Sequence, residues 1–281
     1  MNVARRLFDF FIFSSLYISF CAVLMVYQTN SLLLHIPLSR DLVLFVFFST
    51  MCSYNFHWYL TPFSVQASER IKWTQRYKKL HLTLYFVGLA GCIFFFFKII
   101  DHWIALAFGA FVTFLYSAPK LPLPFFKALK RIAVGKTIFL SIVWMYVTTV
   151  LPILVAGADW KAEYSFFAAS RFFLIYAICI IFDYRDRDDD KREGIRSMIT
   201  YFNETGINLL FIFSIVLFAA STIALYAYNY SVYTILELLT PGVITAALYP
   251  YAKRNYSDYL YYFVLDGLMM FSGLLMLILK I

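Results

Sequence analysis

Long apolar runs separated by short polar connections make up most of this chain. Nine runs are long enough, or nearly long enough, to cross a membrane as helices, because about 20 apolar residues span the hydrocarbon core of a bilayer. They cover residues 7–28, 38–60, 80–100, 102–117, 132–156, 165–183, 206–228, 232–251 and 258–280. No soluble domain interrupts the series, and we expect the first run to be a retained span because it lacks the cleavage site of a signal peptide. The pattern predicts an all-α, polytopic membrane helix bundle of about nine transmembrane helices, formed as a single domain over residues 1–281.

The composition agrees with a lipid environment. Hydrophobic residues make up 62% of the chain and charged residues only 14%, whereas a soluble domain is about 45–50% apolar and about 25% charged. The net charge of +8 raises the question of nucleic acid, but no basic stripe interleaved with aromatic residues lies outside the apolar runs. Each of the four cysteines stands alone inside an apolar run, so we expect neither a zinc site nor a disulfide framework.

Basic residues gather in alternate connections between the apolar runs. On one side lie Arg5, Arg6, Arg70, Lys72, Arg76, Lys78, Lys79, Lys120, Lys127, Lys130, Arg131, Arg185, Arg187, Lys191, Arg192, Arg196, Lys253 and Arg254. The other side holds only Arg40, Lys98, Lys161, Arg171 and Lys280. Cytoplasmic loops carry the excess of Lys and Arg. We therefore predict a multi-pass protein of the cytoplasmic membrane, with its N-terminus inside and its C-terminus outside.

An acidic cluster follows directly on the sixth apolar run. Five aspartates fall within eight residues, from Asp183 to Asp190. At about 100° per residue, Asp183, Asp186 and Asp190 share one stripe of a helix, about 60° wide, while Asp188 and Asp189 point elsewhere. Carboxylates so close together repel one another unless a cation lies between them, and ligands that are all oxygen suit Mg²⁺. The stripe predicts a magnesium site, and the alternative is a solvated loop of mixed charge.

Basic residues stand directly behind the aspartates. Lys191, Arg192 and Arg196 carry donors that can hold phosphate oxygens. An acidic face for a metal beside basic residues for a phosphate group is the combination that the ionisation of a diphosphate requires. The two features together favour a functional site over a solvated loop.

The same stretch resembles a known family. From Asp186 to Ser197, two aspartates four residues apart are followed by a glycine and a basic residue. In this the stretch resembles the second aspartate motif of the UbiA superfamily of intramembrane prenyltransferases. A segment similar to the one after the family's fourth helix contains Leu115, Tyr116, Ser117, Pro119, Leu129, Lys130, Arg131 and Lys136. The resemblance implies a nine-helix bundle that moves a prenyl group from a prenyl diphosphate to a hydrophobic or aromatic acceptor, with Mg²⁺ helping the diphosphate to leave.

The family's first aspartate motif is degenerate in this chain. Its asparagine is matched by Asn55, but the positions of its aspartates hold Phe56, Tyr59 and Phe63, and no carboxylate appears before Glu69. Half of the metal-binding face is therefore absent, which reduces the electrostatic stabilisation of the leaving group. One alternative is a non-catalytic relative that binds isoprenoid lipids or serves as a membrane partner. Another is an unrelated cation carrier or channel, which fits less well because transporters place charge near the membrane midplane.

The enzyme hypothesis assigns roles to individual residues. Asp183, Asp186 and Asp190 are expected to hold Mg²⁺ and so to be catalytic. Substrate contacts are expected from Lys130, Arg131 and Arg196, which would hold the diphosphate, and from Asn55 and Tyr116, which would line the reaction chamber. The remaining partners are the lipid bilayer and the acceptor, which the sequence does not identify.

Two further features have both a functional and a structural interpretation. The basic cluster Arg70, Lys72, Arg76, Lys78 and Lys79 would hold either the diphosphate or anionic lipid headgroups. Asp266 lies several residues inside the last apolar run. Because an intramembrane carboxylate is costly, we expect Asp266 to pair with a polar neighbour or to serve a function.

Overall fold

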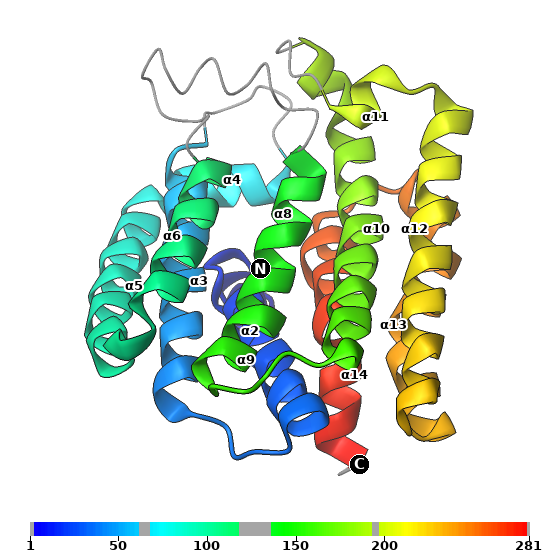
Figure 1. Ribbon diagram of the computed structural model, residues 1–281. Coiled ribbons are helices and arrows are strands. Elements are labelled where there is room, and N and C mark those ends of the chain that lie inside the picture. The colour runs from blue at the N-terminus through cyan, green and yellow to red at the C-terminus, as the bar shows by residue number, and fades with distance from the viewer. Residues whose placement is uncertain (1–2, 62–67, 118–135, 193–196, 280–281) are drawn as a thin grey trace.

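The computed structural model describes residues 3–61, 68–117, 136–192 and 197–279, and this part of the chain folds into helices without a strand (Figure 1). The α-helices are α1 Val3–Phe13, α2 Leu16–Thr29, α3 Arg40–Tyr59, α4 Glu69–Arg76, α5 Lys78–Lys98, α6 Trp103–Ser117, α8 Lys136–Met145, α9 Leu151–Val155, α10 Ala162–Arg192, α11 Met198–Tyr201, α12 Glu204–Ala224, α13 Val232–Ala252 and α14 Asp266–Leu279. Three π-helical segments, Asn30–Leu34, Tyr146–Val150 and Leu260–Leu265, extend or join them, as do the 3₁₀ turns Ile100–His102 and Leu225–Tyr228.

Seven helical stretches of the described chain are long and apolar enough to cross a membrane. The 20-residue α3 and the shorter α6 complete the bundle. The all-α membrane bundle of about nine helices is therefore confirmed. Among the described helices, the short helices α4 and α11 have no counterpart among the predicted spans, and α1 overlaps the beginning of the predicted span 7–28.

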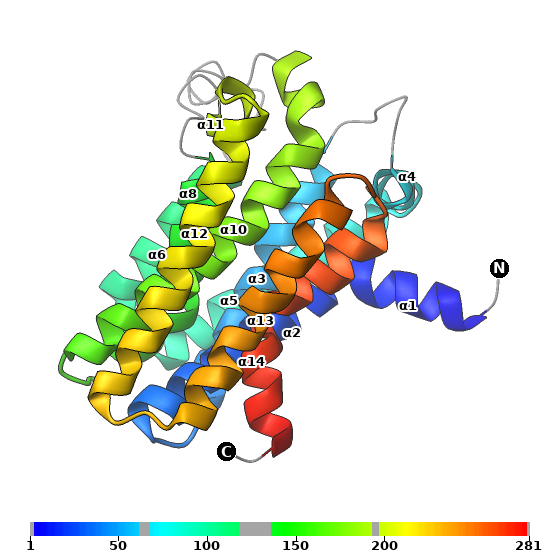
Figure 2. The ribbon, with the colours of Figure 1, turned by 90° about the vertical axis from the view of Figure 1, so that its right-hand side faces the viewer.

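The first predicted span, 7–28, is wrong in its bounds. The helix breaks at Ser14 and Ser15, where Ser15 adopts a left-handed conformation with φ of 69°. α1 is a separate helix that leaves the bundle at a steep angle (Figure 2), and the first spanning stretch runs from Leu16 to Leu34. Apolar residues continue across the break, so hydropathy alone could not reveal it.

α10 forms the centre of the bundle. It lies between α8 and α12 (Figure 1) and also packs against α13 and α14. Residues 174–181 of α10 are all buried, which is the pattern of a helix surrounded on every side. The last turns of α10 continue beyond this core, because its 31 residues reach about 46 Å while the hydrocarbon core of a bilayer is about 30 Å thick.

A buried arginine joins three parts of the bundle. Arg171 of α10 is 5% exposed and donates hydrogen bonds to the Met25 carbonyl at 3.0 Å and to the Thr148 carbonyl at 2.7 Å. Its other acceptors are Gln28 Oε1, Thr29 Oγ1 and Thr149 Oγ1, at 2.7–3.0 Å. These acceptors come from α2 and from the π-helical segment Tyr146–Val150, so the guanidinium ties both to α10.

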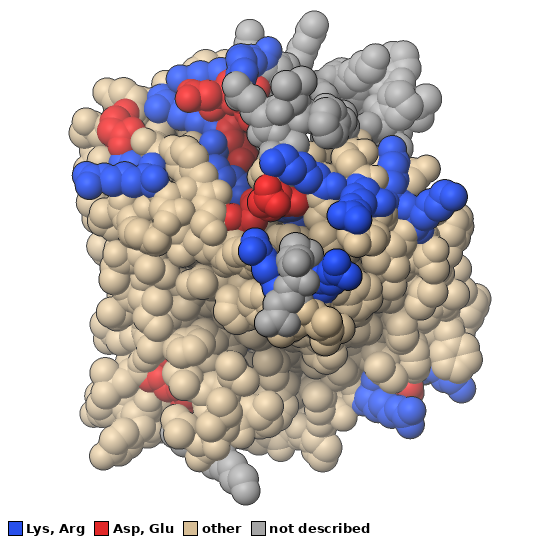
Figure 3. All heavy atoms as spheres, turned by 180° about the vertical axis from the view of Figure 1, so that it is seen from behind, with Lys and Arg blue, Asp and Glu red and all other residues tan. Residues whose placement is uncertain are grey.

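Charge is distributed unevenly over the surface. In the view from behind, Lys and Arg gather mainly over the upper part of the molecule, and apolar or uncharged surface covers most of what lies below (Figure 3). This upper end is the one at which α10 carries its aspartates (Figure 1). The distribution fits a protein with one strongly basic membrane face.

Candidate functional site

The aspartates at the end of α10 separate by burial as the helical period predicts. Asp183 and Asp190 are each 7% exposed, and the side chain of Asp186 is 42% exposed. Asp188 and Asp189 are exposed on another face of the helix. The three members of the predicted stripe therefore turn toward the protein, while the two other aspartates face away from it.

Asp183 connects the stripe to α8. The hydroxyl of Thr137, in the first turn of α8, donates a short hydrogen bond to Asp183 Oδ2. Thr137 is itself 8% exposed. The contact places the beginning of α8 directly against the acidic face of α10.

Asp186 is paired with its chain neighbour. Arg185 Nε lies 2.8 Å from Asp186 Oδ1, and Arg185 Nη2 donates to Tyr262 Oη at 3.0 Å. The same guanidinium stacks on the ring of Tyr261, with 4.4 Å between Cζ and the ring centroid. Arg185 therefore links the acidic face of α10 to the π-helical segment Leu260–Leu265.

A second arginine, which is buried, also lies near the ring of Tyr262. Arg70 of α4 is 3% exposed, and its Cζ lies 4.2 Å from the ring centroid of Trp58 and 5.1 Å from that of Tyr262. Its Nη1 donates to the Ile12 carbonyl at 3.1 Å, at the end of α1. Burial lowers the pKa of the Arg70 guanidinium to about 10, so it stays charged at neutral pH.

Two carboxylates accompany these arginines. Asp258 accepts a hydrogen bond from the backbone N–H of Arg70 at 2.7 Å and so caps the start of α4. Asp266 is partly exposed at the start of α14, and its pairing with a polar neighbour stays a prediction. We call Arg70, Arg185, Tyr262, Asp186 and Asp258 together the polar centre.

Asn55 occupies a fully buried position on α3. Its amide donates to the Ser14 carbonyl at 3.1 Å and to the Met51 carbonyl at 2.8 Å. Its Oδ1 lies 2.7 Å from Nδ1 of His81 on α5. These contacts stabilise the break between α1 and α2, so a contact between Asn55 and substrate stays a prediction that would require Asn55 to leave them.

The other predicted substrate contacts cannot be placed in the same way. Lys130, Arg131 and Arg196 lie outside the described residues. The backbone of Tyr116 belongs to α6, but its side chain is also outside the described part of the chain. Of the basic cluster around Arg70, the other members Lys72, Arg76, Lys78 and Lys79 are all exposed.

The site contains residues that the sequence did not single out, namely Arg185, Tyr262 and Asp258. Arg185 carried a signal, because a cation between Asp183 and Asp186 is placed to neutralise them. Tyr262 and Asp258 carried none, since both stand in an aromatic stretch that reads as an ordinary membrane-interface segment.

The acidic stripe offers carboxylates to a cation, and Arg70 and Arg185 place positive charge nearby for an anion. Among the described residues, no group of three or more His, Cys, Asp or Glu side chains lies close enough to form a metal cage. Mg²⁺ does not need one, because it binds through one or two carboxylates and completes its shell with water and substrate phosphates. Asp186, half exposed, is the most accessible carboxylate of the stripe for this purpose.

Comparison with known proteins gave one match. A sequence model described as the UbiA prenyltransferase family matches residues 61–271, about three quarters of the chain. Neither the curated proteins nor the solved structures compared with the chain gave a match. The matched region includes the acidic end of α10, both arginines of the polar centre and the start of α14.

Proposed function

Because this chain belongs to the UbiA prenyltransferase family, we propose that it transfers a prenyl group from a prenyl diphosphate to a hydrophobic or aromatic acceptor inside the membrane. The observation that carries the proposal is the acidic stripe of α10, with Asp183 and Asp190 buried and Asp186 half exposed. The basic face seen in Figure 3 supports an orientation with this site toward the cytoplasm.

The donor chemistry of the stripe fits Mg²⁺. Asp183, Asp186 and Asp190 are the carboxylates that we expect to hold the ion, and Asp183 also accepts a hydrogen bond from Thr137. All of these ligands are oxygen, as Mg²⁺ requires. When bound, Mg²⁺ would neutralise the charge that develops on the departing diphosphate.

The protein's own residues would orient the groups of the site and exclude water from it. Arg185 holds Asp186 at 2.8 Å and Tyr262 at 3.0 Å, so it fixes the carboxylate on one side of the site. Arg70 and Arg185 place two positive charges near the same tyrosine ring, which favours an anionic group nearby. The apolar faces of the helices would hold the prenyl tail away from water.

A second candidate function is supported by α3. The positions of the family's first aspartates hold Phe56 and Tyr59 on this helix, and Asn55 is fully engaged by protein groups. The end of α3 around Asn55 therefore offers no carboxylate to a metal. This favours the alternative that the chain binds isoprenoid lipids or a membrane partner without turnover.

Metal-dependent binding of a radiolabelled long-chain prenyl diphosphate to the purified protein tests the proposal. Binding is measured with Mg²⁺ and with a chelator, for the wild type, Asp186→Asn and the matched control Asp188→Asn. We expect Mg²⁺ to promote binding, Asp186→Asn to weaken it at least about tenfold, and Asp188→Asn to leave it unchanged.

The outcomes separate the candidate functions. Binding of the prenyl diphosphate that depends on neither Mg²⁺ nor Asp186 would favour the non-catalytic alternative. Equal losses of affinity in Asp186→Asn and Asp188→Asn would contradict the assignment of the stripe. Binding is measured before turnover because a failed activity assay with the wrong acceptor would decide nothing.

A further inference from the structure

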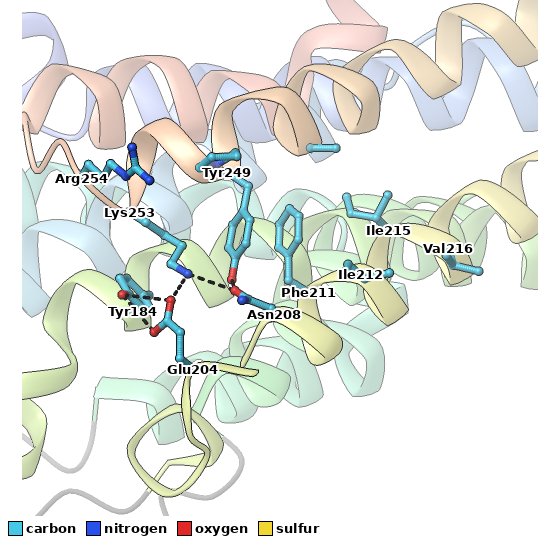
Figure 4. Close-up of a pocket in the computed structure, with 12 residues that line it drawn as sticks. Tyr184, Glu204, Asn208, Phe211, Ile212, Ile215, Val216, Tyr249, Lys253 and Arg254 are labelled. Atoms are coloured by element: carbon cyan, nitrogen blue, oxygen red, sulfur yellow. Dashed lines mark hydrogen bonds and ion pairs between the residues drawn. The ribbon is translucent and has the colours of Figure 1, made fainter. Parts of the chain in front are cut away.

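A groove lies between α12 and α13 and reaches Tyr184 of α10. Its volume is about 590 Å³, within the range of about 300–1,000 Å³ for small-molecule sites. Figure 4 shows the side chains that line it: Tyr184 from α10, Glu204, Asn208, Phe211, Ile212, Ile215 and Val216 from α12, and Tyr249, Lys253 and Arg254 from the end of α13. Polar groups gather at one end of the groove and apolar groups at the other.

The polar end is built around Lys253. Its ammonium pairs with Glu204 and donates to Asn208 Oδ1 at 3.0 Å. The Lys253 side chain is only 14% exposed, whereas that of Glu204 is 50% exposed. Tyr184 Oη donates to the same carboxylate at 3.2 Å, and Tyr249 Oη donates to Asn208 at 2.7 Å. Hydrogen bonds from three helices therefore hold this end in a fixed arrangement.

This end carries an excess of positive charge. Of the charged residues that line the groove, Lys253 and Glu204 neutralise each other, which leaves Arg254. Arg254 is exposed, lines the groove and makes no side-chain hydrogen bond or ion pair with the residues that the structure describes. A single positive charge at the mouth of the groove favours an anion over a neutral or zwitterionic group.

The apolar end faces the surroundings of the bundle. Ile212 is 55% exposed and Val216 is 56% exposed, one turn apart on α12. The rings of Phe211 and Tyr249 stack at 3.8 Å and join the two helices behind them. In a membrane this face contacts the acyl chains of lipids. The exposed side chains of Ile212 and Val216 give an acyl chain a defined path along α12.

We propose that this groove binds a phospholipid with an anionic headgroup. The phosphate lies against Arg254 and Lys253, and one acyl chain follows Ile212 and Val216 along α12. The polar end lies where α12 begins and α13 ends, which is the basic end of the molecule and the level of lipid headgroups on that side. The inference does not depend on the proposed transferase activity, because no member of the acidic stripe lines the groove.

Native mass spectrometry of the full chain in mild detergent tests the proposal. Phosphatidylglycerol and phosphatidylcholine with identical chains are added, and the number of retained molecules is counted. We expect the wild type to retain one phosphatidylglycerol about fivefold more strongly than phosphatidylcholine, since one basic side chain near the membrane surface contributes about that factor.

Two pairs of variants identify the groove as the site. Arg254→Gln should abolish the preference for phosphatidylglycerol, whereas Arg6→Gln, which removes an exposed charge of α1 outside the groove, should keep it. Val216→Trp fills the apolar path and should lower retention of both lipids. Leu209→Trp alters an exposed residue of α12 outside the groove and should change neither.

Three results would overturn the proposal. They are equal retention of the two lipids by the wild type, the same behaviour of Arg254→Gln and Arg6→Gln, and displacement of the lipid by glycerol 3-phosphate at comparable concentration. The last would mean that the polar end binds a free phosphate and that the apolar path contributes nothing.

Discussion

Replacing Arg171 with methionine tests how the bundle is held together. The guanidinium is 5% exposed and has no carboxylate partner among the described residues. Instead it donates to neutral oxygens: the carbonyls of Met25 and Thr148, and the side chains of Gln28, Thr29 and Thr149. Arg171→Met removes these donors and the charge while keeping most of the length of the side chain.

Two opposing effects determine how much Arg171→Met changes the free energy of unfolding. Nη1 has two hydrogens for four acceptors, and Nη2 has one acceptor, so about three hydrogen bonds from a charged donor are lost. Such bonds contribute about 1.5–3 kcal/mol each. Removing a buried charge relieves its desolvation, which offsets part of this loss. Thr29 Oγ1 can still donate to Met25 or Thr148, and Ser272 still lies 3.4 Å from Gln28 Oε1. We expect a net destabilisation of about 2–4 kcal/mol.

Unfolding of the purified protein by SDS in mixed micelles measures this free energy. Arg40→Met, at an exposed position at the start of α3, is the control and should change the free energy of unfolding by less than about 0.5 kcal/mol. Arg171→Lys should cost at least as much as Arg171→Met, because lysine keeps the buried charge but cannot reach all of the acceptors. A stability of Arg171→Met within about 0.5 kcal/mol of the wild type would refute the reasoning.

Two further substitutions test close packing and capping. Gly88→Ala should destabilise the bundle by about 1–3 kcal/mol in the same assay, because the added Cβ would lie 2.7 Å from the backbone nitrogen of Cys52. The control Gly109→Ala should cost less, because its Cβ would meet only the ring of Tyr146, at 3.3 Å. Asp258→Ala removes the acceptor of the Arg70 backbone N–H and should destabilise the start of α4 by about 1 kcal/mol. Hydrogen exchange of the backbone amides of residues 69–76 should then become faster. Unchanged exchange there would contradict the capping role.

Much of the fold is predictable from the apolar runs because membrane spans have a length that the bilayer imposes. α3, α5 and α13 begin and end within a few residues of their predicted bounds, 38–60, 80–100 and 232–251. The same signal fails at Ser15, where the backbone turns without any change in hydropathy. A bend of this kind depends on contacts with other helices, such as the hydrogen bond from Asn55 to the Ser14 carbonyl.

The polar centre is less predictable, because its members come from distant parts of the chain. The stripe on α10 follows from helical spacing alone. Arg70 does not, since the sequence offers no sign that it turns inward while its neighbours Lys72 and Arg76 stay exposed. Its burial depends on Trp58, on Tyr262 and on Asp258, the last of which lies 188 positions away. The pattern of neighbouring residues cannot predict contacts between residues that are so far apart in the sequence.

The lack of carboxylates around Asn55, at the end of α3 that matches the family's first motif, changes how the test with Asp186 should be understood. With ligands from α10 alone, Mg²⁺ would take one or two carboxylates and obtain the rest of its shell from water and the substrate's phosphate oxygens. Metal and diphosphate would then each raise the affinity of the protein for the other by the same factor. A titration with Mg²⁺ alone would therefore say little, because the metal would bind weakly until the diphosphate supplied its ligands. If Asp186 is a ligand, as proposed, Phe56 and Tyr59 cannot replace it, so a single substitution on α10 tests whether this half of the site binds metal.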